Sequence, residues 1–125
     1  MDEGIQIKIG KILDEYYDDA VDEITKATNK VANYAVKELK ATSPRDTGEY
    51  AGGWKKKVDK NRLKIEAVVY NGTSPGLTHL LEHGHVTSNG NGRIYPRTPA
   101  HPHIDRVNKE AQKMYLEELE RRLSK

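Results

Sequence analysis

The feature that most restricts the fold is a long apolar stripe at helical spacing in the first third of the chain. Its members recur every three or four residues, the period that places side chains on one face of an α-helix. Pro44 disfavours helical geometry at Ser43 and donates no backbone hydrogen bond, so the helix should end near Thr42. The stripe predicts a helix of about 30 residues from roughly position 10, about 45 Å long. Its members are Ile9, Leu13, Tyr16, Ala20, Ile24, Ala27, Val31, Ala35 and Leu39.

The length of this helix has a consequence for the rest of the molecule. The chain has 125 residues, which corresponds to one domain, so we expect residues 1–125 to form a single unit. Only 35% of the residues are hydrophobic and 32% are charged, so the core should be modest. Because such a core cannot cover so long a helix completely, we expect the far end of the helix to pack on another chain.

Further elements follow in the order strand, strand, short helix, strand, helix. Alternation of apolar and polar residues predicts the strands, and turn residues separate them. The fold class is therefore α+β: a long N-terminal helix and a C-terminal helix pack on a small antiparallel β-sheet, with a short helix between strands. The expected elements are strands at 54–58 and 63–70, a hairpin loop at 59–62, a short helix from about Pro75 to His83, a mobile polar loop at 87–92, a strand at 93–95 and a helix at 104–123.

Charge is distributed unevenly, although the formal net charge is only +2. Residues 1–25 contain two basic and eight acidic residues, whereas residues 26–65 contain eleven basic and four acidic residues. Opposite charge on successive segments suits head-to-tail contact between identical copies, or a charged partner. The alternative is that both segments form solvated faces that keep a small protein soluble.

Several classes of protein are excluded by what the sequence lacks. There is no Cys, which excludes disulfides, a thiolate nucleophile and a Cys-based zinc site, and makes an intracellular origin the default. No apolar run approaches the roughly 18 to 20 residues that span a bilayer, so we expect no membrane partner. The acidic start lacks the basic and apolar segments of a secretory signal. The glycines do not have the spacing of a phosphate-binding loop, and no serine lies in a nucleophile elbow.

One segment, His79-Leu80-Leu81-Glu82-His83, matches the H-x-x-E-H pattern of a class of zinc peptidases. On a helix, His79 and His83 would project from one face and could share a zinc ion, with Glu82 beside them as a base. A third ligand on another helix is needed, which so small a domain can scarcely provide. A small zinc hydrolase is therefore one alternative function, and non-catalytic metal binding is another, against a default of ordinary surface or interface histidines. The histidines concerned are His79, His83, His85, His101 and His103.

A second alternative is a nucleic-acid-binding module on the predicted hairpin. Lys55 and Lys57 share one face of an extended strand, and Lys60 and Arg62 follow in the loop. Such a basic edge can neutralise phosphates without reading sequence. Lysines on an edge strand also prevent unwanted strand pairing, which is the structural explanation of the same residues.

Three segments, taken in order, form a recognisable set. The first is Ser43-Pro44-Arg45-Asp46-Thr47-Gly48, with Trp54 six residues on. The second is residues 68–71 followed by residues 79–84, and the third is residues 99–104 at the start of the terminal helix. Together they cover roughly positions 40 to 110 and resemble the neck and tail-completion family of tailed bacteriophages, also described as head-tail joining or minor tail component proteins. His83 departs from this family, in which the position is usually aromatic.

The resemblance implies a structural protein of a virion or prophage, and no enzyme or cofactor. It implies a homo-oligomeric ring that joins or completes the tail, assembled in the bacterial host cytoplasm and carried in the virion beside other head, neck or tail proteins. Such a ring could line a DNA passage and contact the DNA backbone without sequence preference. The residues implied to have structural and assembly roles are Asp46, Thr47, Gly48, Trp54, His79, Glu82, Gly84, Pro102 and His103.

Overall fold

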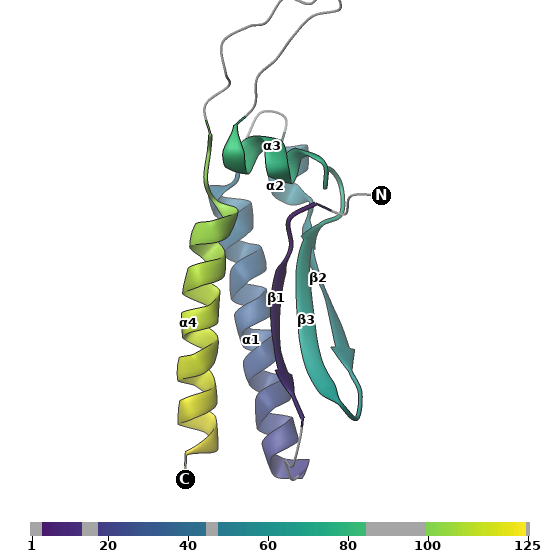
Figure 1. The fold of residues 1–125 in the computed structure, drawn as a ribbon, viewed down its shortest axis with the longest axis vertical. Coiled ribbons are helices and arrows are strands. Elements are labelled where there is room, and N and C mark those ends of the chain that lie inside the picture. The colour runs from purple at the N-terminus through teal and green to yellow at the C-terminus, as the bar shows by residue number, and fades with distance from the viewer. Residues whose placement is uncertain (1–3, 14–17, 45–47, 85–99, 125) are drawn as a thin grey trace, which may run out of the picture.

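The computed structural model describes residues 4–13, 18–44, 48–84 and 100–124. The predicted α+β class is confirmed: three strands form one antiparallel sheet, and two long helices pack along one face of it (Figure 1). The elements are β1 (Ile7–Ile12), α1 (Asp18–Thr42), α2 (Glu49–Gly52), β2 (Trp54–Lys60), β3 (Lys64–Asn71), α3 (Leu77–His83) and α4 (Ile104–Leu123).

The predicted start of the first helix is wrong, because residues from Ile7 to Ile12 form a strand. Ile7 and Ile9 are buried while Lys8 and Gly10 are exposed, which is the two-residue period of a strand. Ile9 also fits the helical stripe, so the spacing alone could not separate the two structures. Gly10 favours the strand: it weakens a helix, and a side chain there would lie 2.6 Å from the carbonyl oxygen of Ile65.

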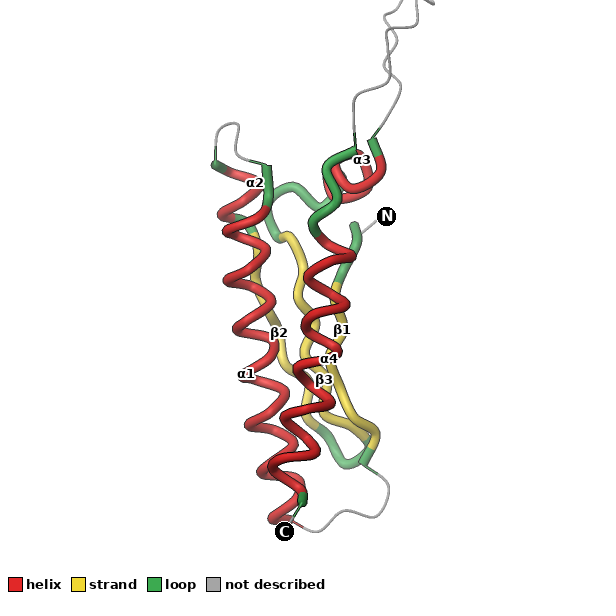
Figure 2. Tube along the Cα trace, turned by 90° about the vertical axis from the view of Figure 1, so that its left-hand side faces the viewer, coloured by secondary structure: helices red, strands yellow, loops and turns green. Residues whose placement is uncertain are grey.

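The helix that follows, α1, ends at Thr42 as predicted and buries the stripe from Ile24 to Leu39. Ile24, Val31 and Leu39 have no exposed surface in the single chain, and the same holds for the alanines between them. The expectation that part of this stripe packs on another chain is therefore wrong for the residues from Ile24 to Leu39. α4 and the sheet together cover this part of α1 (Figure 2).

The sheet has β3 in its middle, paired antiparallel with β1 on one side and β2 on the other. One face packs on α1 and α4, and no described helix covers the other, which we call the outer face. Leu63, the first residue of the strand predicted at 63–70, is 73% exposed, because β3 begins one residue later and Leu63 belongs to the turn. The outer-face residues are Lys8, Gly10, Ile12, Lys55, Lys57, Asp59, Lys64, Glu66, Val68 and Tyr70.

The two long helices lie side by side over the inner face (Figure 2). Ile104, Val107 and Ala111 of α4 are buried against the core, and α4 covers the residues predicted for the terminal helix, 104–123. A buried hydrogen bond of 2.8 Å joins the hydroxyls of Thr28 and Tyr115 across the helix pair, so the contact is not purely apolar. The helix contact fixes α4, and with it the segment that enters α4.

The short helix α3 closes one end of the molecule, near the position predicted for it. The expected loop at 87–92 and strand at 93–95 lie outside the described residues. None of the described helices combines the length and the apolar character that a membrane crossing requires.

Candidate functional site

Residues from all three recognised segments meet in a buried polar cluster at the end of the molecule that carries α2 and α3. We call this group the polar cluster. Its members are at most 6% exposed, and they come from the end of α1, from α2, β2, β3 and α3, and from the start of α4. They are Ser43, Tyr50, Trp54, Asn71, Glu82 and His103.

The side chain of Glu82 binds the backbone at the amino-terminal end of α4. Its Oε1 atom accepts hydrogen bonds from the backbone N–H groups of His103 at 2.9 Å and Ile104 at 2.8 Å. Its Oε2 atom accepts a third from Asp105 at 2.9 Å. The N-cap residue of α4, His103, makes no side-chain capping bond, so a side chain from α3 satisfies these donors instead. A carboxylate at this position also interacts favourably with the helix dipole.

The charge of Glu82 follows from these contacts. Burial raises the pKa of the carboxyl, but hydrogen bonds from the three backbone donors more than offset burial and leave the pKa below its usual value. The carboxylate is therefore ionised at neutral pH. Both of its oxygens are occupied in capping α4, which is a structural task.

His103 links Glu82 to Tyr50. Burial lowers the pKa of the imidazole, which favours the neutral ring, while the carbonyl of His101 and the charge of Glu82 act in the opposite direction. In that neutral state Nδ1 donates to the carbonyl oxygen of His101 at 2.7 Å, and Nε2 accepts from the Tyr50 hydroxyl at 2.7 Å. Burial raises the pKa of Tyr50, so its hydroxyl keeps the proton that this bond requires.

Trp54 and Asn71 connect the cluster to the sheet. The indole Nε1 of Trp54 donates to the hydroxyl of Ser43 at 2.8 Å. The rings of Trp54 and Tyr50 pack edge-on, with their centroids 5.7 Å apart. The side-chain amide of Asn71 donates to the Tyr50 carbonyl at 2.8 Å and accepts from the backbone N–H of Ser74 at 2.7 Å. Sequence reasoning missed Tyr50 and Asn71. Asn71 precedes Gly72, a pair typical of turns, and this pattern could have indicated a structural role for Asn71. No sequence pattern marks Tyr50.

The remaining predicted residues lie around the cluster. Gly48 adopts a φ of 89° before α2, and Gly84 a φ of 74° after α3, conformations that L side chains rarely adopt. Pro102 is exposed and directly precedes the N-cap of α4. The predictions for Asp46 and Thr47 fall outside the described residues.

The histidines of the H-x-x-E-H segment differ from Glu82 in burial. His79 and His83 are exposed on α3 with ring centroids 6.5 Å apart, whereas Glu82 on the same helix is buried and bonded to the backbone of α4. A zinc hydrolase needs this carboxylate beside the metal, but here it caps α4. Within residues 4–13, 18–44, 48–84 and 100–124, no group of three His, Cys, Asp or Glu side chains has the geometry of a metal site.

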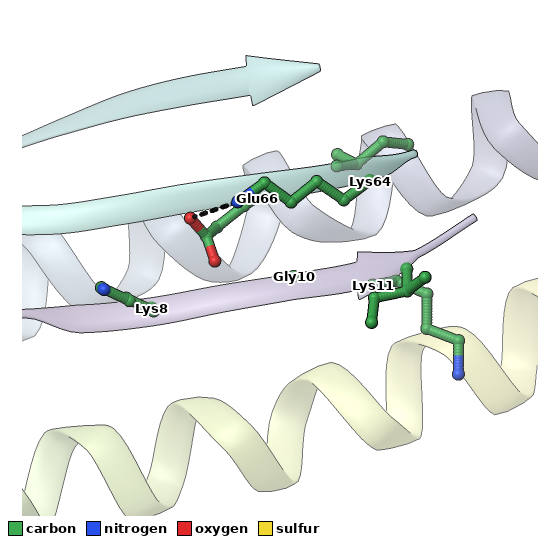
Figure 3. A pocket seen from close by; sticks show the side chains of 7 residues that line it. Lys8, Gly10, Lys11, Lys64 and Glu66 are labelled. Carbon is green, nitrogen blue, oxygen red and sulfur yellow. Dashed lines mark ion pairs between the residues drawn. The ribbon is translucent and has the colours of Figure 1, made fainter. Parts of the chain in front are cut away.

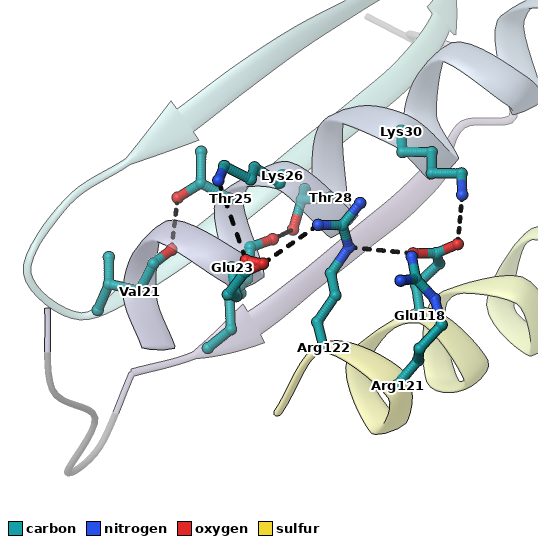
Figure 4. Close-up of polar contacts among 10 residues, drawn as sticks. Val21, Glu23, Thr25, Lys26, Thr28, Lys30, Glu118, Arg121 and Arg122 are labelled. Atoms are coloured by element: carbon teal, nitrogen blue, oxygen red, sulfur yellow. Dashed lines mark hydrogen bonds and ion pairs between the residues drawn. The ribbon is translucent and has the colours of Figure 1, made fainter. Parts of the chain in front are cut away.

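A second polar group ties α4 to α1 near the opposite end of the molecule (Figure 4). Glu118 accepts hydrogen bonds from Lys30 of α1, from Arg121 at 2.6 Å and from Arg122 at 3.0 Å. Arg122 reaches Glu23 of α1 at 3.3 Å as well. The bond from Lys30, followed by those from the arginines, lowers the pKa of Glu118 to about 2 despite the opposing effect of burial.

The lowered pKa of Glu118 predicts a specific pH dependence. A carboxyl whose pKa is depressed in the folded state stabilises the fold above its usual pKa, and this contribution is lost as pH falls through the folded value. Glu118→Gln should lower the free energy of unfolding by about 1 kcal/mol at pH 7. The difference from wild type should shrink between the ordinary pKa of 4.5 and about 2. Urea unfolding at several pH values measures it, and a difference that stays constant over this range would contradict the assignment.

In the part of the chain that the structure describes, each hydrogen bond of the polar cluster joins a member to another member or to nearby backbone, so the cluster contributes to packing. The fold and the cluster thus define a small α+β protein whose buried polar residues hold its elements together. Residues 7–84 match the model of the HK97-gp10-like family, described as "Bacteriophage HK97-gp10, putative tail-component". The protein belongs to this family of phage tail components.

The extent of the family match adds to the structural description. It runs from β1 to the residue after α3, so it includes Glu82 and the whole sheet but not α4. Searches among curated proteins and among solved structures found no match. Since Glu82 caps α4, a residue of the matched region positions a helix outside it.

Proposed function

We propose that this protein is a structural component at the head-tail junction or tail end of a phage particle, where a ring of identical copies joins or completes the tail. The proposal treats residues 1–125 as one domain with that role. The observation that carries it is the family match, which spans the sheet, α1 and α3. The outer face of the sheet, which no described helix covers, offers a surface for assembly.

In this proposal the predicted residues act by fixing the shape that is assembled. Trp54 and Glu82 join α1, the sheet, α3 and α4 into one body through the polar cluster. Gly48 and Gly84 permit the turns on either side of it, and Pro102 and His103 lead into α4. Rigidity of this kind serves a ring, because each copy must present two surfaces at a fixed angle.

Deletion of the gene from the phage genome that encodes this chain tests the proposal. Electron microscopy should show heads and tails that fail to join, or tails that are not completed, and the titre should fall by several orders of magnitude. Supplying the wild-type chain in trans should restore joined particles, and mass spectrometry should detect the chain in them. Joined particles at wild-type titre in the deletion, or particles that lack the chain, would overturn the proposal.

A further inference from the structure

The outer face of the sheet has the chemistry of a protein-binding surface. Lys8, Lys55 and Lys57 are exposed around Val68, which lies in the middle of the face and is 8% exposed. The Nζ atom of Lys57 lies 5.6 Å from the centroid of the Tyr70 ring. Exposed cations around a small apolar centre resemble the polar rim and apolar core of protein interfaces.

The outer face is also hollowed. One hollow of about 280 Å³ is lined by Lys8, Lys57 and Val68 among others, and a second of about 200 Å³ lies over Gly10. Figure 3 shows the second hollow, where Glu66 and Lys64, two residues apart on β3, form an ion pair of 3.5 Å. Absence of a side chain at Gly10 keeps this part of the face open.

Two carboxylates on this face decide between classes of partner. Asp59 and Glu66 lie directly opposite each other in the register of β2 and β3, one row beyond Lys8 and Lys57 on the side away from Lys55. A phosphate backbone that runs along the face would be repelled by them, whereas a short acidic surface of a protein can meet the three lysines without reaching this pair. The face therefore favours a protein that brings carboxylates to the lysines.

The same chain provides such a partner surface at the start of α1. Asp18, Asp19 and Asp22 are exposed there on a rigid helix. Asp18 and Asp22 lie about one turn apart, or about 5 to 6 Å, on one side of the helix. Lys55 and Lys57 lie about 7 Å apart on one side of β2, so two ion pairs can form together.

The two surfaces belong to opposite layers of the molecule, since α1 packs on the inner face of the sheet (Figure 2). We propose that the outer face of one copy binds the acidic start of α1 of a second copy, with Lys8, Lys55 and Lys57 facing Asp18, Asp19 and Asp22. One copy then uses both surfaces at once, with two different neighbours, which is a heterologous contact that can close into a ring. This inference rests on the proposed function.

Charge reversal on the full chain tests the contact. The face variant carries K8E, K55E and K57E, the helix variant carries D18K, D19K and D22K, and a combined variant carries all six. Sedimentation velocity at fixed low salt should show self-association at least tenfold weaker in each triple variant, because like charges meet. The combined variant has the wild-type net charge with both surfaces reversed, and it should recover association to within about threefold of wild type.

Matched controls separate this contact from general charge effects. K26E, K37E and K113E together change the net charge as much as the face variant does but lie on the helices, and they should weaken association less than threefold. Circular dichroism confirms that each variant is folded. A combined variant that stays as weak as the triple variants would overturn the inference.

Two further outcomes keep this inference distinct from the proposed function. A wild-type chain that remains monomeric at every concentration would remove the contact between copies, while its detection in joined phage particles would leave the proposed function standing. The other outcome concerns DNA. If the protein binds a short DNA duplex, and this binding is lost in the face variant and unchanged in the helix variant while neither variant affects self-association, the face binds phosphate and the inference is overturned.

Discussion

Replacement of Glu82 by alanine should lower the free energy of unfolding at pH 7 by about 3 to 4 kcal/mol. The carboxylate accepts hydrogen bonds from three consecutive backbone donors at the start of α4. Each buried donor left without an acceptor costs about 1 to 3 kcal/mol, although water entering the space would recover part of this. Thermal unfolding followed by circular dichroism at fixed protein concentration should show a melting temperature lower by on the order of 10 °C.

Two controls identify the cause of this loss. Glu82→Gln keeps one acceptor oxygen but removes the charge, so it should lie between wild type and Glu82→Ala. Glu117→Ala removes an exposed glutamate from α4 and should change stability by less than about 0.5 kcal/mol. If Glu82→Ala were as mild as Glu117→Ala, the capping of α4 by α3 would not be a source of stability.

The sequence predicted most of the fold where one periodicity dominated. The stripe from Ile24 to Leu39 has only a helical interpretation, and Pro44 marks its end, so this part of α1 was predicted correctly. Near Ile9 the helical spacing overlaps with the alternation of Ile7 and Ile9, which together with Gly10 favours a strand, and Ile9 pairs with Ala67 of β3. That pairing joins residues far apart in the sequence, so the local pattern could indicate a strand but not its partner.

The sequence identified several residues of the candidate site but did not predict how they are arranged in space. Trp54, Glu82 and His103 were identified by resemblance, yet nothing in the sequence places the Glu82 carboxylate on the backbone of α4, 21 or more residues away. The H-x-x-E-H pattern suggested that Glu82 lies with its neighbouring histidines. In the structure Glu82 is buried, because its carboxylate accepts hydrogen bonds from three backbone N–H groups at the start of α4. His79 and His83, on the same helix, are exposed.

Replacement of Trp54 by alanine should be at least as damaging, with a loss of about 3 to 5 kcal/mol, the range for large buried aromatic residues. The side chain is 1% exposed and contacts the rings of Tyr50 and His103 edge-on, at 5.7 and 6.5 Å between centroids. Its removal leaves a cavity where β2 meets the polar cluster and leaves the Ser43 hydroxyl without its indole donor. Since domains of this size are stable by only about 5 to 15 kcal/mol, much of the protein should unfold in mild urea.

Trp54→Phe separates the two contributions, because it keeps an aromatic ring and removes the Nε1 donor. It should cost about 1 to 2 kcal/mol, the loss expected for one buried hydrogen bond and slightly poorer packing. Trp54 is the only tryptophan, so unfolding must be followed by far-ultraviolet circular dichroism instead of fluorescence. Leu116→Ala, at a leucine that is 68% exposed on α4, should change stability by less than about 0.5 kcal/mol. A Trp54→Ala variant within 1 kcal/mol of wild type would mean that the polar cluster does not depend on this ring, and that α1 and α4 hold the fold without it.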